Sequence, residues 1–261
     1  MSVRPPIVLC FSGHDPSGGA GIQADIEAIV SHRCHAASVI TALTEQDSRN
    51  VKKLLPQNPA DIIGQAETVL NDFKVSAIKI GLLGHPDTAL AIHDILRQCP
   101  DIPVVLDPVL AAGGGTELAG QQLIAAIVDK LLPLTAVLTP NSQEARKLAG
   151  KDDLTDCARL LLAKGAQNVL ITGSHENSLL VHNRLFMPDN LNETFNWERL
   201  PQHYHGSGCT LASAIAALLA QGLDVFTAVN EAQEYTWQSL AAAYLPGKGQ
   251  YNPQRLFWMD A

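Results

Sequence analysis

The residues with the clearest chemical potential are a serine between two glycines and the cysteine that follows, Gly206-Ser207-Gly208-Cys209. An apolar, alanine-rich segment comes next and predicts a buried helix. Glycines let successive backbone N–H groups point at one ligand, and a helix start adds partial positive charge. Residues 206–209, here called the anion loop, therefore predict a pocket for a transferring phosphoryl group. In the first helical turn we expect the pKa of the Cys209 thiol to be lowered. The alternative is a glycine-rich helix entry with a small buried thiol.

A second glycine-rich loop leads from Asp15 to Asp25, after the first apolar run. In a doubly wound sheet such a loop lies beyond the carboxyl end of a strand, where ligands bind. Gly19, Gly21 and Ala24 fit the loose dinucleotide pattern, but a long turn separates them from the strand. The two acids suit a substrate with hydroxyl or amino donors better than a phosphate. A tight turn capped by aspartates is the alternative.

A third candidate is Asn141 with Glu144, three residues apart at a predicted helix start. Their oxygens could hold a hydrated Mg²⁺ that carries nucleotide phosphates, because Mg²⁺ takes few protein ligands and keeps waters. The same spacing is that of an Asn-x-x-Glu capping box, which has no catalytic role.

A fourth candidate is Asp107-Pro108-Val109, which ends another apolar run and precedes three glycines at 113–115. The glycines indicate either a mobile loop over the site or an ordinary surface loop. All four candidates fall at the ends of predicted strands or at helix starts, so we expect them to share one edge of a sheet.

The elements that position these residues alternate along the chain. Short apolar runs rich in Val, Ile and Leu are typical of strands buried on both faces of a parallel sheet. They predict strands at 6–12, 36–42, 76–81, 103–107, 136–139 and 168–173. Helical periodicity predicts helices at 22–32, 59–73, 87–97, 121–131, 142–149, 153–164, 209–221 and 225–243. An antiparallel edge hairpin is expected at 179–186 and near Trp197. The order predicts an α/β fold, a three-layer αβα sandwich with a mainly parallel central sheet, as a single domain over 1–261.

Composition excludes several classes of function. The net charge is −8 and no Lys/Arg run occurs, which argues against a nucleic-acid partner. No apolar run is long enough to span a membrane. The five cysteines form no CxxC, so we interpret them as reduced thiols of a cytoplasmic protein. The nine histidines form no HExxH, and each is interpreted as a surface or capping residue.

The motifs occur together in one known order. They are residues 12–25, 38–43 with Gln46, 79–81, 107–109, 139–141 with Glu144, and 206–210, and the similarity extends through 247–253. This set resembles the hydroxymethylpyrimidine/phosphomethylpyrimidine kinases of thiamine biosynthesis, within the ribokinase-like superfamily. The resemblance implies a homodimeric enzyme that uses ATP and Mg²⁺. It would phosphorylate 4-amino-5-hydroxymethyl-2-methylpyrimidine and then its monophosphate.

The resemblance also implies roles for individual residues. The pyrimidine pocket would comprise Gly13, Asp25, Gln46, Leu82 and Val109, with Leu82 where the family usually has Met. The Mg-ATP site would comprise Asp107, Asn141, Glu144, Thr172 and Gly173, with Asn141 and Glu144 holding the metal through water. The catalytic group would comprise Gly206, Ser207, Gly208 and Cys209, with Cys209 as the base.

Three departures concern cations that would face phosphate. Residues 111–115 contain no Lys or Arg, and Thr172 and Gln202 stand where relatives often carry Lys. Loss of charge-assisted contacts predicts weaker use of the monophosphate. Two other functions stay open: a pyridoxal or pyridoxine kinase, and a non-catalytic sensor of a pyrimidine or a nucleotide.

Overall fold

The computed structural model describes residues 4–259, and nine strands in this part of the chain form one sheet in the order β3-β2-β1-β4-β5-β6-β7-β8-β9. The strands are β1 (Ile7–His14), β2 (His35–Gln46), β3 (Val51–Pro56), β4 (Val75–Ile80), β5 (Val104–Leu106), β6 (Val137–Leu138), β7 (Val169–Ile171), β8 (Leu180–Phe186) and β9 (Asn192–Glu198). The helices are α1 (Gly21–Ser31), α2 (Pro59–Asp72), α3 (Pro86–Leu96), α4 (Gln121–Ala126), α5 (Ser142–Ala149), α6 (Leu154–Ala163), α7 (Ser207–Ala220) and α8 (Val225–Ala241).

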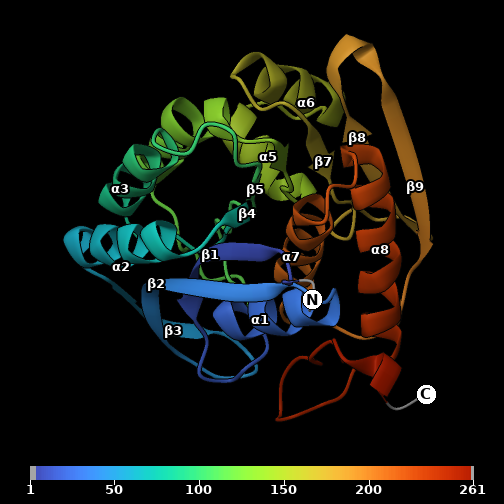
Figure 1. The fold of residues 1–261 in the computed structure, drawn as a ribbon. Coiled ribbons are helices and arrows are strands. Elements are labelled where there is room, and N and C mark those ends of the chain that lie inside the picture. The colour runs from blue at the N-terminus through green and yellow to red at the C-terminus, as the bar shows by residue number, and fades with distance from the viewer. Residues whose placement is uncertain (1–3, 260–261) are drawn as a thin grey trace.

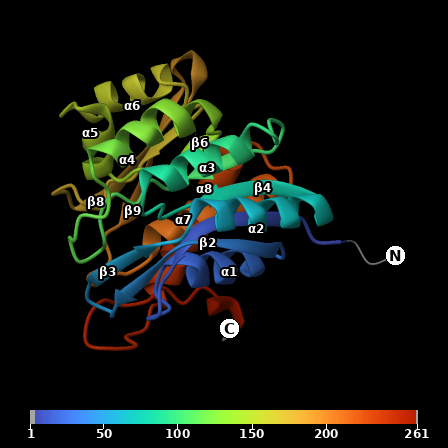
Figure 2. The ribbon, with the colours of Figure 1, turned by 90° about the vertical axis from the view of Figure 1, so that its left-hand side faces the viewer.

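Successive residues of β1 point into two different cores. Leu9 and Phe11 pack with apolar residues of α2 to α6, whereas Val8 and Cys10 pack with those of α1, α7 and α8. Figure 1 shows these two groups of helices on opposite faces of the sheet, and Figure 2 turns the α2–α3–α4 face toward the viewer. Because both faces are covered, the strands have continuous apolar sequences. The predicted three-layer αβα sandwich is confirmed.

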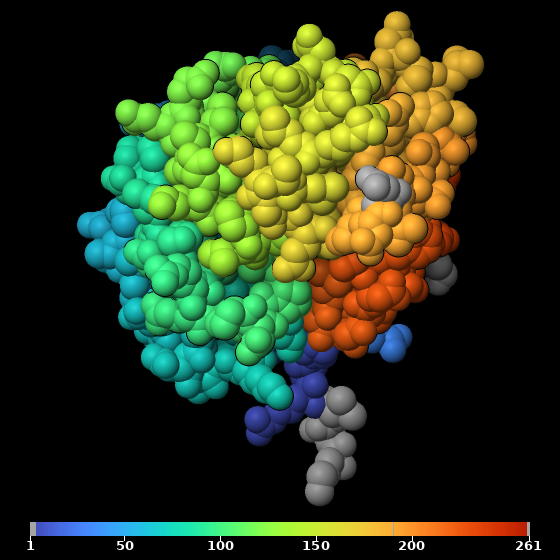
Figure 3. Space-filling model, turned by 90° about the horizontal axis from the view of Figure 1, so that it is seen from above, coloured from blue at the N-terminus to red at the C-terminus, as the bar shows by residue number. Residues whose placement is uncertain are grey.

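Most of the sheet is parallel, as predicted. Strands β2, β1 and β4 to β7 pair in parallel, and β8 and β9 add the expected antiparallel hairpin at one edge. Figure 3 shows the green, yellow and orange segments following one another across the surface in chain order, since consecutive elements are neighbours.

The sequence analysis missed one strand and predicted one helix incompletely. Strand β3 pairs antiparallel with β2 at the other edge, and the sequence analysis missed it because Val51 is its only buried residue. The helix expected at 121–131 is α-helical only through Ala126 and continues as a π-helical turn, Ile127–Leu131, before Pro133. Neither difference moves a candidate site residue.

The carboxyl ends of the parallel strands all lie on the same side of the sheet, and α7 begins on that side as well. Residues of the loops that follow β1, β4, β5, β6 and β7 line one cavity together with the anion loop. Helices long and apolar enough to cross a membrane are absent from residues 4–259.

Candidate active site

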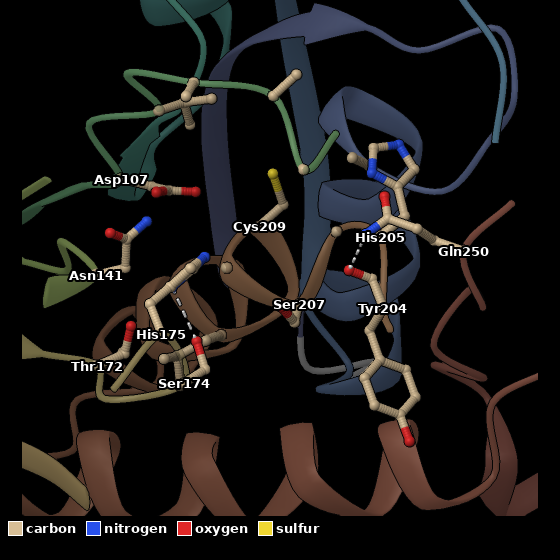
Figure 4. Close-up of a pocket in the computed structure, with 18 of the residues that line it drawn as sticks. Asp107, Asn141, Thr172, Ser174, His175, Tyr204, His205, Ser207, Cys209 and Gln250 are labelled. Carbon is tan, nitrogen blue, oxygen red and sulfur yellow. Dashed lines mark hydrogen bonds between the residues drawn. The ribbon is translucent and has the colours of Figure 1, made fainter. Parts of the chain in front are cut away.

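A cavity of about 1220 Å³ opens at the carboxyl edge of the parallel strands. Twelve of the predicted site residues line it: Gly13, Gln46, Leu82, Asp107, Val109, Asn141, Glu144, Thr172, Gly206, Ser207, Gly208 and Cys209. Figure 4 shows Cys209 between Asp107 and Asn141 on one side and His205 and Gln250 on the other. The fold thus brings all four candidate motifs to one place.

The anion loop takes its shape from Gly206. This residue has φ 83° and ψ 14°, in the left-handed region that favours glycine, and α7 begins directly after it. A side chain here would also collide with the backbone oxygen of Gly19. The first N–H groups of a helix have no partner within the helix, and those of Ser207, Gly208 and Cys209 begin α7 beside the cavity. The loop is therefore built to receive an anion.

Cys209 does not have the lowered pKa expected of a cysteine at a helix start. Burial raises its pKa to about 12; the Lys79 ammonium opposes this rise, and the Asp107 and Asp25 carboxylates add to it. Desolvation disfavours the thiolate more than the helix start favours it. At neutral pH the resting side chain is therefore a thiol.

Asp25 lies beneath the anion loop instead of in the cavity wall. Its Oδ1 is 2.7 Å from the Nζ of Lys79, and both side chains are fully buried. Nζ also donates to Ser12 Oγ at 2.9 Å, and Ser213 Oγ of α7 donates to Asp25 Oδ1 at 2.7 Å. Burial lowers the pKa of Lys79, but the combined charges of Asp25, Cys209, Asp107 and Cys10 outweigh this, so the lysine pKa is raised. Direct contact of Asp25 with a pyrimidine is therefore not supported, because Asp25 is fully buried and does not line the cavity.

Two carboxylates line the cavity beyond Cys209. Burial raises the pKa of Asp107 to about 6, and burial together with the Asp107 charge raises the pKa of Glu144 to about 7. A divalent cation would relieve this repulsion, and carboxylate oxygens suit Mg²⁺. The donor chemistry therefore fits a hydrated Mg²⁺. No three His, Cys, Asp or Glu side chains of residues 4–259 cluster as a metal site of their own.

Asn141 and Glu144 form the capping box that the sequence left as an alternative. Asn141 Oδ1 accepts hydrogen bonds from the N–H groups of Gln143 and Glu144, and Glu144 Oε2 accepts from Asn141 N, all at 2.9 Å. The other oxygen, Glu144 Oε1, accepts from Leu110 N at 3.0 Å and so ties the helix to the loop after Asp107. Since the Asn141 oxygen is committed to the cap, its NH₂ group is left to donate toward a phosphate or a water.

Gln46 meets a histidine that the sequence analysis had interpreted as a surface or capping residue. Its Nε2 lies 3.0 Å from His205 Nε2, and Thr44 Oγ1 donates to its Oε1 at 2.9 Å. His205 Nε2 also lies 2.8 Å from Asp15 Oδ2. Burial raises the pKa of Asp15, but hydrogen bonds from His205 and Ser17 outweigh this and hold it below its usual value. The expected pyrimidine side thus has an ordered polar pair, Gln46 with His205.

Gly173 does not reach the cavity. Its N–H donates to Asn183 Oδ1 at 3.0 Å, and its Cα packs against the backbone of His182 in β8. The expected contact of Gly173 with ATP is therefore not supported, because its backbone N–H is used within the protein. Thr172, which precedes it, does line the cavity beside Asn141.

A family model described as phosphomethylpyrimidine kinase matches residues 15–254. The chain belongs to this kinase family. It is 36% identical over 251 residues to hydroxymethylpyrimidine/phosphomethylpyrimidine kinase from Haemophilus influenzae, and the match covers 93% of each chain. An ADP complex of Bacillus subtilis pyridoxal kinase has a TM-score of 0.89 at 28% identity and covers 96% of this chain and 97% of its own. A phosphomethylpyrimidine kinase from Clostridium difficile has a TM-score of 0.78 at 31% identity, with 90% and 99% covered.

These similarities confirm the predicted family, the ribokinase-like fold and the enzyme class. The protein is an ATP-dependent small-molecule kinase.

The kinase has two cations in the cavity wall that the sequence analysis missed, Lys147 and Arg199. Lys147 Nζ lies 2.8 Å from Glu117 Oε1. Arg199 donates to three backbone oxygens, those of Ser174, Glu176 and Ser178. Lys147 follows Glu144 by three residues on α5, a spacing that puts both on one helix face and could have revealed it. Arg199 carries no such local signal. Arg199 is held by three backbone oxygens and so does not replace the lysines absent at 172 and 202, whereas Lys147 is paired with the exposed Glu117.

Proposed function

We propose that this kinase transfers the γ-phosphoryl group of ATP to the hydroxymethyl group of 4-amino-5-hydroxymethyl-2-methylpyrimidine, and then to the resulting monophosphate, in thiamine biosynthesis. The observation that carries the proposal is that the anion loop, Gln46 and Asp107 line one cavity, in a chain 36% identical to a kinase named for these substrates.

The pyrimidine binds at the end of the cavity near β1 and β2. Gln46 hydrogen-bonds the aminopyrimidine edge, because an amide both donates and accepts. Leu82 and Val109 supply apolar contacts to the ring, and Gly13 lets the Leu82 side chain pack closely, since a Cβ at Gly13 would lie 2.7 Å from Leu82 Cδ2. The hydroxymethyl group then faces Cys209.

Phosphoryl transfer depends mainly on positioning and electrostatic stabilisation. The backbone N–H groups of Ser207, Gly208 and Cys209 stabilise the oxygens of the transferring group. A new bond forms between the substrate oxygen and phosphorus, the bond to ADP breaks, and the hydroxyl proton moves to Cys209. With a pKa of about 12 only the small thiolate fraction of Cys209 accepts this proton, so the rate depends on pH.

The sequence analysis assigned the metal to Asn141 and Glu144. Because the Asn141 oxygen already accepts two capping hydrogen bonds, Mg²⁺ would instead be held through water by Asp107 and Glu144, and it would neutralise charge on the ATP phosphates. The Asn141 NH₂ group donates to a phosphate oxygen, and Thr172 lies beside it. In solution we expect a homodimer, as the resemblance implies, and a cytoplasmic location, as the cysteine pattern predicts. Light scattering after size-exclusion chromatography tests the dimer.

An ADP-release assay with the pyrimidine alcohol, its monophosphate and pyridoxal tests the proposal. We expect kcat/KM to be at least about tenfold higher for the alcohol than for pyridoxal, a difference of one buried hydrogen bond. Preference for pyridoxal would instead support the pyridoxal kinase suggested by the structural similarity. Tight binding of the pyrimidine without ADP release would support a sensor.

A further inference from the structure

Arg255 lies in the segment after α8, near the anion loop. Like Lys79, it is a positively charged side chain that is almost completely buried. Its side chain is 1% exposed, and all three guanidinium nitrogens are used. Nη1 pairs with Glu27 Oε2 at 2.9 Å, and the Glu27 side chain is 43% exposed. Burying a guanidinium is costly unless its donors and its charge are satisfied. The partners of the other two nitrogens, Nη2 and Nε, therefore bear on the role of this buried charge.

Those two nitrogens join the two loops that form the catalytic end of the cavity. Nη2 donates to the backbone oxygen of Gly19, in the loop of residues 15–21, here called the substrate loop. Nε donates to Thr210 Oγ1 at 2.8 Å, and Thr210 Oγ1 donates in turn to the backbone oxygen of Gly206 at 2.8 Å. Thr210 directly follows Cys209. One guanidinium therefore fixes the substrate loop and, through a hydroxyl, the turn that begins α7.

The loops are also in contact with each other, so their relative position matters. A Cβ at Gly206 would collide with the Gly19 oxygen, and a Cβ at Gly19 would collide with the His205 ring, so neither position has space for a side chain. The C-terminal segment adds two backbone bonds: Tyr251 N donates to His203 O, and His205 N donates to Tyr251 O, each at 2.9 Å. The segment that carries Arg255 thus holds both sides of the anion loop.

We propose that Arg255 is a positioning residue for phosphoryl transfer: it holds Gly19 and Thr210 so that the N–H groups of Ser207, Gly208 and Cys209 face the transferring group. This inference rests on the proposed role of the anion loop. A displacement of such donors by about 1 Å costs roughly 10²-fold in rate. Lysine cannot replace the guanidinium, because a single ammonium lacks the planar fork that reaches three acceptors in fixed directions.

The test compares Arg255→Ala, Arg255→Lys and Glu27→Gln by ADP release. We expect kcat of Arg255→Ala to fall about 10²-fold with KM for the alcohol nearly unchanged, and millimolar guanidinium to restore part of it. Arg255→Lys should recover little. Glu27→Gln, the matched control, removes the exposed partner and leaves the bonds to Gly19 and Thr210, so its kcat should stay within about twofold of the parent.

Thr210→Val removes only the hydroxyl link and serves if Arg255→Ala does not fold. We expect its kcat to fall about tenfold, and that of Thr210→Ser to stay near the parent value. The proposal would be overturned if folded Arg255→Ala or Thr210→Val had the kcat of the parent. Full activity of Arg255→Lys would overturn it as well. Each variant is compared with the parent on whichever alcohol the parent uses. The test of Arg255 is therefore separate from the test of the proposed substrate, which depends on the parent's own preference among alcohols.

Discussion

Two ion pairs of this kinase have nearly the same length and opposite surroundings. Lys79 and Asp25 are 2.7 Å apart beneath the anion loop, and both side chains are 0% exposed. Lys147 and Glu117 are 2.8 Å apart at the mouth of the cavity, and their side chains are 43% and 76% exposed. Water weakens the attraction in the second pair and not in the first. Distance alone therefore does not say which pair the fold depends on.

The comparison also shows where the enzyme places its positive charge. The buried Lys79 cannot exchange partners, and its charge offsets part of the rise that burial causes in the pKa of Cys209 and Asp107. It is a fixed part of the field at the catalytic end. Lys147 can leave Glu117 for a phosphate at little cost, because both groups are already hydrated. Charge at the mouth can thus respond to a bound nucleotide.

The largest expected effect is that of Lys79→Met on stability. Removing one partner leaves Asp25 as an uncompensated buried charge, so the free energy of unfolding should fall by about 3–5 kcal/mol. The double variant Lys79→Met/Asp25→Asn should recover most of that loss, since no buried charge remains. Urea denaturation followed by circular dichroism measures both. A single variant as stable as the parent would mean that water or rearrangement satisfies Asp25.

The next largest effect concerns Cys209 and the catalytic end of the cavity. If the thiol is the base, Cys209→Ala should lower kcat by about 10²–10⁴-fold with little change in KM. Because its pKa lies near 12, the reactive thiolate fraction grows as the pH rises, so parent kcat should increase between neutral and alkaline pH by about tenfold per unit. Cys209→Asp should move this rise to lower pH, since a carboxyl group ionises earlier.

Pre-steady-state and steady-state rates from pH 6 to 10 provide the measurement, with Cys99→Ala as a control cysteine far from the cavity. A flat pH profile together with a Cys209→Ala rate within about threefold of the parent would remove the thiol from the role of base.

A smaller effect is expected at Thr172, on the open side of the cavity. The monophosphate must approach the ATP phosphates, and like charges so close need cations between them. We expect the parent to use the monophosphate less efficiently than the alcohol. Thr172→Lys should lower KM for the monophosphate or ATP by about tenfold, the value of one charge-assisted hydrogen bond. Thr172→Met, of similar length without charge, is the control. Equal efficiency on both substrates, with no gain from the added lysine, would contradict the argument.

The smallest effect should come from Lys147→Ala, which breaks a pair of the same length as the buried one. Its urea midpoint should match that of the parent, because both partners keep their hydration. A loss comparable to that of Lys79→Met would show that length, and not burial, sets the energy of these pairs.

Local features of the sequence were enough to predict most of the framework. Continuous apolar runs predicted the six parallel strands. Asn141 with Glu144 predicted a helix start, and the observed capping box confirms it. Glycine at 206 before an apolar run correctly predicted the turn into α7. Strand β3 was missed because an edge strand with one buried residue lacks an apolar run.

Long-range pairing could not be predicted from those features. Asp25 meets Lys79 across 54 positions, and Gln46 meets His205 across 159. Arg255 reaches Gly19 across 236 positions, and no pattern around Arg255 distinguishes it from a surface arginine. Each pairing depends on which strands are neighbours in the sheet and on how the C-terminal segment returns to the first loop.

The sequence by itself determined which residue types stand at the carboxyl edge of the sheet, because strand periodicity, glycine positions and helix caps act over a few residues. Only the tertiary structure decided their electrostatic state. The helix start at Cys209 suggested a lowered pKa, yet burial raises it to about 12. Desolvation and charge pairing depend on everything packed around a group, and most of that surrounding protein comes from distant parts of the chain.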